Sequence, residues 1–88
     1  MDGSKLFLDV RNPDELSDGK IKGAVNIPVD ELAQQIPHLP ADKEIILYCN
    51  SGIRAEMGYN ILKKTERKSR YLDARMIFDG DEFSGEEN

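Results

Sequence analysis

One stretch of the chain decides the fold: an apolar run that ends at the only cysteine and leads into a helical pattern. It reads Ile45-Ile46-Leu47-Tyr48-Cys49-Asn50-Ser51-Gly52-Ile53-Arg54. A short, β-branched apolar run predicts a buried strand. The helical pattern that follows extends over residues 55–64. The order is therefore strand, tight loop, helix, and in a parallel α/β sheet ligands bind just beyond the carboxyl end of such a strand.

The loop after the strand has the composition of an anion-binding loop. Amides that open a helix favour an anion, and a nearby guanidinium does the same. Gly52 can adopt a φ that a residue with a Cβ resists, so that several backbone N–H groups can converge. A free cysteine is often only a small buried apolar residue. With these neighbours, we interpret Cys49 as a reactive nucleophile and Arg54 as the cation of its loop.

Length and composition exclude several classes of protein. Eighty-eight residues predict one domain, and no apolar run approaches the roughly 18 residues of a membrane span. The net charge of −5 argues against nucleic acid as a partner. One Cys and one His predict neither a disulfide framework nor a metal site. No signal-peptide pattern is present, and a lone thiol is compatible with the cytoplasm, which we expect, although a leader removed earlier would also permit the periplasm.

Strand and helix patterns alternate along the chain, which predicts an α/β fold with a small parallel sheet flanked by helices. Strands are predicted at residues 5–10, 24–27, 45–48 and 69–72, with a short edge strand or extended segment at 76–78. Helical segments are predicted at residues 12–16, 30–36 and 55–64, the second ended by Pro37 and Pro40. We expect the domain to span residues 5–83, with disordered or frayed ends at 1–4 and 84–88.

Three blocks of the sequence together resemble the single-domain rhodanese-like sulfurtransferase family. They are Leu8-Asp9-Val10-Arg11 with Pro13-Asp14-Glu15, then residues 19–28, and then residues 46–55, in the order and at the spacing of the family. The resemblance implies a rhodanese-like α/β fold and a catalytic Cys49 that carries sulfane sulfur as a persulfide. It implies that the substrate is bound by the loop residues Asn50, Ser51, Gly52, Ile53 and Arg54.

The reaction that the resemblance implies needs no cofactor and has two covalent steps. Thiosulfate, polysulfide or a persulfide would donate sulfur to Cys49, and cyanide or a thiol would accept it. Phosphatases that share this fold place five residues between cysteine and arginine, whereas Cys49 and Arg54 enclose four. Tyr48 also replaces the histidine that precedes the phosphatase cysteine. Both differences favour sulfur transfer over a phosphatase or arsenate reductase.

Departures from the family pattern concern the charge of the loop. Asn50 stands where many relatives carry a basic residue, so that Arg54 is the only cation within the loop, and Glu56 adds a negative charge just after it. We therefore predict weak turnover of thiosulfate, a dianion, and better use of polysulfide or a protein persulfide. Asp9 and Arg11 are predicted to form a structural ion pair, and Lys20, where the family often has histidine, to be a structural or surface residue.

The ends of the chain also depart from the family. The strand and helix that usually precede the first block are missing, which makes the fold short at its N-terminus, and the usual Gly-Gly-x-x-x-Trp ending is absent. The chain fits a natural minimal form or a fragment, such as the rhodanese domain fused to some flavin-dependent coenzyme A disulfide reductases. An open sheet edge would favour a homodimer. The alternative function is a non-catalytic binding or thiol-sensing module with a redox protein as partner.

A basic cluster surrounds the predicted end of the last helix. Its members are Lys63, Lys64, Lys68, Arg67 and Arg70. A solvated helix end is the interpretation we favour, and a docking site for an acidic partner is the alternative. His38, between two prolines of an apolar segment, is assigned no catalytic role.

Overall fold

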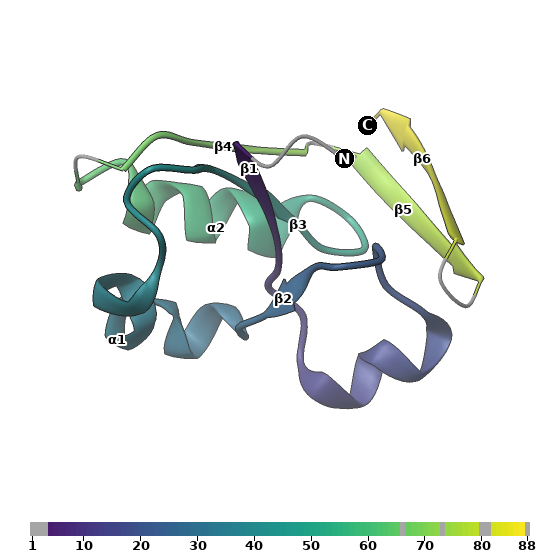
Figure 1. Ribbon diagram of the computed structural model, residues 1–88. Coiled ribbons are helices and arrows are strands. Elements are labelled where there is room, and N and C mark those ends of the chain that lie inside the picture. Colours follow the sequence, from purple (N-terminus) through teal and green to yellow (C-terminus); the bar gives the residue numbers. More distant parts are fainter. Residues whose placement is uncertain (1–3, 66, 73, 80–81, 88) are drawn as a thin grey trace.

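The computed structural model describes residues 4–65, 67–72, 74–79 and 82–87. Its main sheet has four parallel strands in the order β2-β1-β3-β4 (Figure 1). The strands are β1 (Lys5–Asp9), β2 (Val25–Asn26), β3 (Glu44–Tyr48) and β4 (Ser69–Tyr71). The predicted small parallel α/β sheet is confirmed, and β3, which leads to the cysteine, lies inside it between β1 and β4.

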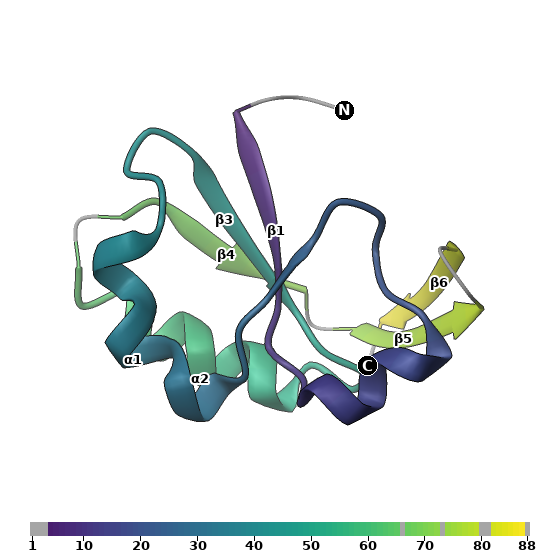
Figure 2. The ribbon, with the colours of Figure 1, turned by 60° about the horizontal axis from the view of Figure 1, so that its bottom comes forward.

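Helical segments connect the strands. They are η1 (Pro13–Asp18), η2 (Val29–Glu31), α1 (Leu32–Gln35), η3 (Ile36–His38) and α2 (Ile53–Leu62), where η marks a 3-10 helix. Figure 2 shows α1 and α2 next to each other beneath one face of the sheet. Among the described residues, no helix is long and apolar enough to cross a membrane.

The central strand β3 is buried on both of its faces. Successive side chains of a strand point to opposite sides. Ile45 and Leu47 accordingly belong to the larger core beside the helices, and Tyr48 belongs to a smaller core with Ile21. These residues of β3 and the intervening Ile46 are at most 1% exposed. The sequence prediction of a buried strand at 45–48 is confirmed.

Gly58 lets α2 pack closely against β3. A Cβ at this position would lie 2.7 Å from Leu47 Cδ2 and 3.2 Å from Leu32 Cδ2. The first distance is far shorter than a normal carbon–carbon contact. The absence of a side chain here therefore sets how near the cysteine-loop helix comes to the sheet.

The helix predicted at residues 30–36 is longer and less regular than expected. Helical geometry extends from Val29 to His38 through η2, α1 and η3. Contrary to the prediction, Pro37 does not end it, because a proline in the first turn of η3 needs no N–H donor there. The segment stops at Leu39, whose N–H donates to Ile36 O at 3.0 Å, and Pro40 follows.

The helix predicted at residues 55–64 is displaced toward the cysteine. It starts at Ile53, because Gly52 takes a left-handed φ of 93° and serves as the N-cap residue. It ends at Leu62, whose carbonyl accepts hydrogen bonds from Thr65 Oγ1 at 2.7 Å and from Thr65 N at 2.9 Å. Lys63 and Lys64 therefore follow the helix instead of forming its last turn.

A separate antiparallel pair, β5 (Ala74–Asp79) and β6 (Glu82–Glu87), lies beside the main sheet (Figure 1). The sequence predicted only a short strand at 76–78 and a frayed end at 84–88. Instead, residues 84–87 pair with residues 74–77, because a nearby antiparallel partner satisfies the backbone groups of both segments. Ser4 also departs from the expected disorder, since its carbonyl accepts Glu44 N–H at 2.8 Å. Residues 1–3, 80, 81 and 88 lie outside the described residues.

Candidate active site

Cys49 lies directly after β3, where the sequence placed it. Hydrogen bonds from the segments that follow β1 and β4 continue up to the end of β3. Val10 N–H donates to Tyr48 O at 3.1 Å, and Leu72 N–H donates to Leu47 O at 2.9 Å. The side chain of Cys49 is 0% exposed and belongs to the larger core cluster. The thiol is therefore held at the base of the loop, at the carboxyl edge of the sheet, and not on the surface.

The backbone of the loop is directed at the sulfur. Gly52 N–H donates to Cys49 Sγ at 3.0 Å, and this amide opens the ten-residue helix α2. The left-handed φ of Gly52 aims the N–H inward, a conformation that L residues with a Cβ rarely adopt. A backbone donor at the start of a helix favours negative charge on the atom that it contacts. The geometry thus suits a thiolate, or a sulfur anion attached to it.

Arg54 forms a two-point ion pair with Glu15, a residue far away in the sequence. Its Nη1 and Nη2 atoms lie 2.6 and 2.8 Å from the two carboxylate oxygens of Glu15. Nη2 also donates to Asn50 Oδ1 at 3.0 Å. The predicted loop cation is therefore tied to the loop through Asn50 and to η1 through Glu15. From the sequence, Glu15 is expected only to favour the start of a helical turn, and no role at the cysteine loop is predicted for it.

Local structure fixes Glu15 in this position. Asn12 N–H donates to Glu15 Oε2 at 2.9 Å, and Glu15 N–H donates to Asn12 O at 3.0 Å, which closes a reciprocal cap around Pro13 at the start of η1. The Asn-x-x-Glu spacing is visible in the sequence and predicts this cap. It does not predict that the same carboxylate also meets Arg54.

The ion pair perturbs both of its members. The hydrogen bonds from Arg54 lower the pKa of Glu15 from 4.5 to about 2, and the hydrogen bonds to Glu15 raise the pKa of Arg54 above its usual value. The side chains of Arg54 and Glu15 are 26% and 28% exposed, so solvent screens part of the attraction. Glu15 is therefore ionised throughout the neutral pH range.

A lowered carboxyl pKa in the folded state predicts a pH-dependent contribution to stability. This contribution is complete above pH 4.5, the ordinary value for Glu15, and is lost as the pH falls toward about 2. We expect wild type and Glu15→Gln to differ most in melting temperature at pH 5–7 and to converge below about pH 3. Thermal melts across this range measure the difference, and a gap that stayed constant down to pH 2 would contradict the assignment.

Glu56 follows Arg54 closely in the sequence, but its carboxylate contacts β4. Its Oε2 accepts a hydrogen bond from Tyr71 OH at 2.9 Å, so this carboxylate is turned toward β4. Residues two positions apart on a helix do not face each other, and Glu56 is two positions after Arg54. Glu15, and not Glu56, is the carboxylate that faces the loop arginine.

The other predicted loop residues occupy different positions around the sulfur. Asn50 is exposed and contacts Arg54, and Ser51 is half-buried. The Ile53 side chain is 68% exposed, so it does not line the buried sulfur, and Met57, one turn later, is 50% exposed. The structure therefore brings Asn50, Gly52 and Arg54 together around Cys49 and leaves the Ile53 side chain in solvent.

Asp9 and Arg11 form a buried ion pair beneath the site, as predicted. The pair is bonded through Arg11 Nη2 and Asp9 Oδ2 at 2.8 Å and through Arg11 Nε and Asp9 Oδ1 at 3.0 Å. Burial alone would lower the pKa of Arg11, but the hydrogen bonds to Asp9 raise it above its usual value. Arg11 Nη2 also donates to Gly19 O at 2.7 Å. The pair thus joins β1 to the segment that follows η1.

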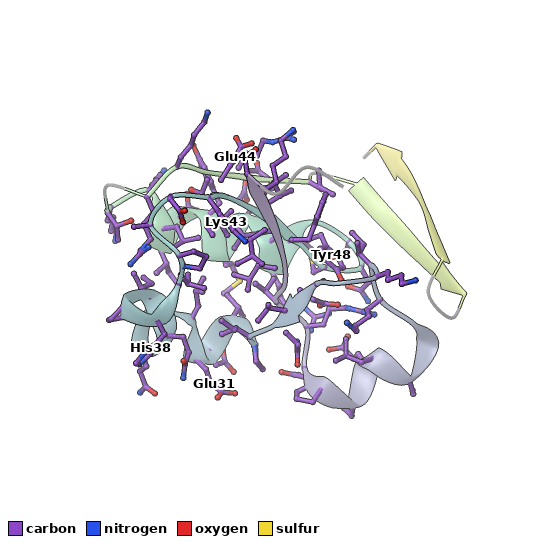
Figure 3. All side chains as sticks on the ribbon, in the orientation of Figure 1. Glu31, His38, Lys43, Glu44 and Tyr48 are labelled. Carbon is purple, nitrogen blue, oxygen red and sulfur yellow. The ribbon has the colours of Figure 1, made fainter. Side chains whose placement is uncertain are left out.

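Tyr48 extends this buried polar layer to the residue before the cysteine. Its hydroxyl accepts a hydrogen bond from Ile21 N–H at 3.0 Å, and burial raises the pKa of Tyr48 above its usual value. Figure 3 shows His38 beside α1, well away from Tyr48. Lys20 donates to Ala24 O at 3.1 Å, which supports its predicted structural role.

Several members of the predicted basic cluster contact the protein itself, among them Lys63, whose Nζ lies 5.8 Å from the centroid of the Tyr59 ring. Arg67 Nη1 donates to Leu39 O at 2.7 Å, and Arg70 Nε lies 3.7 Å from Glu44 Oε2. These contacts tie the segment after α2 to neighbouring elements. They favour the interpretation of a solvated helix end over that of a docking site.

The cysteine at the end of β3, the amide-lined loop and the arginine at the start of α2 agree with one protein family. A family model described as the rhodanese-like domain matches residues 1–78. The chain belongs to the rhodanese-like family. Its members include single-domain sulfurtransferases, and the chain is similar to one of them, the human single-domain sulfurtransferase TSTD1. That structure is 26% identical with a TM-score of 0.70, covering 81% of this chain and 76% of the human one.

The chain spans only part of the length of several proteins that it matches. The chain is 34% identical over 77 residues to an HTH-type transcriptional regulator of Mycobacterium tuberculosis, covering 85% of this chain and 34% of the regulator. It is also similar to the Bacillus anthracis protein CoADR-RHD in its reduced form, at 38% identity and a TM-score of 0.75, covering 78% of this chain and 12% of that one. The chain thus corresponds to about a third of the regulator and about an eighth of the Bacillus anthracis protein.

Proposed function

We propose that the protein is a rhodanese-type sulfurtransferase that moves sulfane sulfur through a persulfide on Cys49. In the first step the Cys49 thiolate attacks the outer sulfur of the donor, for example thiosulfate. The new Cys–S–S bond forms as the S–S bond of thiosulfate breaks, and sulfite leaves with the electron pair. In the second step cyanide or a thiolate attacks the outer persulfide sulfur. Thiocyanate or a new persulfide forms, and the Cys49 thiolate returns.

The observation that carries this proposal is the contact of 3.0 Å between Gly52 N–H and Cys49 Sγ. A donor aimed at Cys49 Sγ stabilises the thiolate before it attacks the donor, and stabilises it again when the acceptor removes the outer sulfur and the thiolate is released. Arg54 lies at the same loop through its bond to Asn50, where it can contact an anionic donor. The two steps exchange only sulfur–sulfur and sulfur–carbon bonds, so the proposal requires no metal or cofactor.

Mass spectrometry of the intact protein tests the proposal. After exposure to polysulfide or thiosulfate, wild type should gain about 32 Da, the mass of one sulfur atom, and cyanide should remove it. Cys49→Ser should show no gain, because serine cannot form a persulfide. A wild-type protein that gains no mass with any sulfane donor would contradict the proposed sulfurtransferase activity.

A second candidate function is a rhodanese-like binding or thiol-sensing module. The exposed side chains of Ile53 and Met57, one turn apart next to the cysteine loop, favour this candidate because such apolar pairs suit protein contacts. A role within a larger reductase, a redox protein as partner, or a homodimer would fit it. The mass experiment discriminates, because a binding module would leave Cys49 unloaded with every donor.

A further inference from the structure

The ion pair between Glu15 and Arg54 has a consequence for the donors that the site accepts. Arg54 is the basic residue of the cysteine loop, and both oxygens of Glu15 are bonded to its guanidinium, at 2.6 and 2.8 Å. A paired carboxylate cancels most of the field that an arginine would otherwise direct at an approaching anion. The positive potential at the loop is therefore weaker than an unpaired arginine would produce.

Asn50 strengthens this effect. Its Oδ1 accepts from the same Nη2 atom that contacts Glu15, at 3.0 Å. The guanidinium is thus directed by two acceptors, a carboxylate from η1 and an amide oxygen from the loop. Three of its five N–H donors point at these two partners, and the Glu15 carboxylate offsets its positive charge. Arg54 remains oriented toward the loop, but its electrostatic attraction for a doubly charged anion is reduced.

We propose that Glu15 is a positioning and specificity-determining residue, which holds Arg54 at the Cys49 loop and directs the site toward sulfane donors of low negative charge. Thiosulfate, with two negative charges, is disfavoured by this arrangement, and persulfides with one charge on the sulfur chain are accepted more readily. The inference rests on the proposed sulfur-transfer function but concerns the potential at Cys49, which can be measured without sulfur chemistry.

A matched pair of alkylating reagents measures this potential directly. Iodoacetate is an anion, iodoacetamide is neutral, and both transfer a similar group to a thiolate with loss of iodide. We expect Glu15→Gln to raise the ratio of the iodoacetate rate to the iodoacetamide rate at Cys49 by about three- to tenfold at low salt, because one nearby negative charge is removed. The increase should shrink as salt is added, since screening weakens the field.

Two variants serve as controls. Glu31→Gln removes the same charge from an exposed position in η2 and should leave the ratio unchanged. Glu15→Asp keeps the charge and should keep the ratio near that of wild type, even if the shorter side chain weakens the cap of η1. A purely structural role of Glu15 predicts that both alkylation rates change by the same factor, so that the ratio stays constant, and this result would overturn the inference.

Sulfur transfer provides the second measurement. The efficiency with thiosulfate, relative to that with a singly charged organic persulfide, should rise in Glu15→Gln by the same three- to tenfold, mainly through a lower KM for thiosulfate. Unchanged donor preference in a Glu15→Gln protein that still forms the persulfide would contradict the inference alone. Absence of the persulfide in wild type would contradict the proposed function, whereas the alkylation ratio would still report on Glu15.

Discussion

The Gly52→Ala variant is expected to form the Cys49 persulfide about 100-fold more slowly than wild type, the usual effect of losing one donor from an anion-stabilising site. Gly52 has a φ of 93° and donates its N–H to Cys49 Sγ at 3.0 Å. An alanine is strained in this conformation by about 1–2 kcal/mol. The loop should relax toward negative φ and turn the N–H away from the sulfur.

The matched control for this variant is Gly23→Ala. Gly23 also has a positive φ, 84°, but lies in an exposed turn before β2. Alanine there should carry a similar backbone cost and lower the melting temperature, while persulfide formation stays within about twofold of wild type. The rate of mass gain with polysulfide compares the two variants. Equal losses of rate in both would show that general destabilisation, and not the amide at Cys49, is responsible.

Asp9→Ala is expected to have the largest effect on stability, about 3–5 kcal/mol, because it leaves the buried guanidinium of Arg11 without its partner. The Arg11 and Asp9 side chains are 3% and 0% exposed and are joined by several hydrogen bonds. For a domain of this size such a loss is a large part of the total stability. The variant should be partly or wholly unfolded at 37 °C.

Denaturation with urea measures this effect, with Asp42→Ala as the control. Asp42 is an exposed residue of the loop before β3, and its removal should change the free energy of unfolding by less than about 0.5 kcal/mol. The double variant Asp9→Leu with Arg11→Met should recover much of the stability, since apolar replacement of a buried ion pair is often neutral or stabilising. A loss below about 1 kcal/mol for Asp9→Ala would contradict a role for the pair in holding the sheet.

Much of the fold could be predicted because local pattern and burial agree along the chain. The apolar run of β3 allowed only a buried strand, and alternation of strands with helices required a parallel sheet. The limits of the helices were less predictable. Gly52 moved the start of α2 to Ile53, and the 3-10 turn of η3 accommodated Pro37, because both depend on backbone angles that composition does not specify.

The pairing of residues 84–87 with 74–77 was missed for a related reason. Residues 84–87 have the acidic, polar composition of a frayed end, and their pairing with residues 74–77 comes from the proximity of two backbone segments in register. Hydrogen bonding between strands is a property of the backbone and leaves only a weak signal in a polar sequence.

The sequence by itself determined the order of strand, loop and helix around Cys49, because spacing along the chain fixes which residues share a turn. Cys49, Gly52 and Arg54 are close in sequence, and local geometry alone brings them together. Only the tertiary structure decided which carboxylate meets the arginine. Glu15, 39 residues before Arg54, reaches it because η1 docks beside the loop, whereas Glu56 turns toward Tyr71. The charge of the site is thus set by packing between distant segments, which local spacing does not encode.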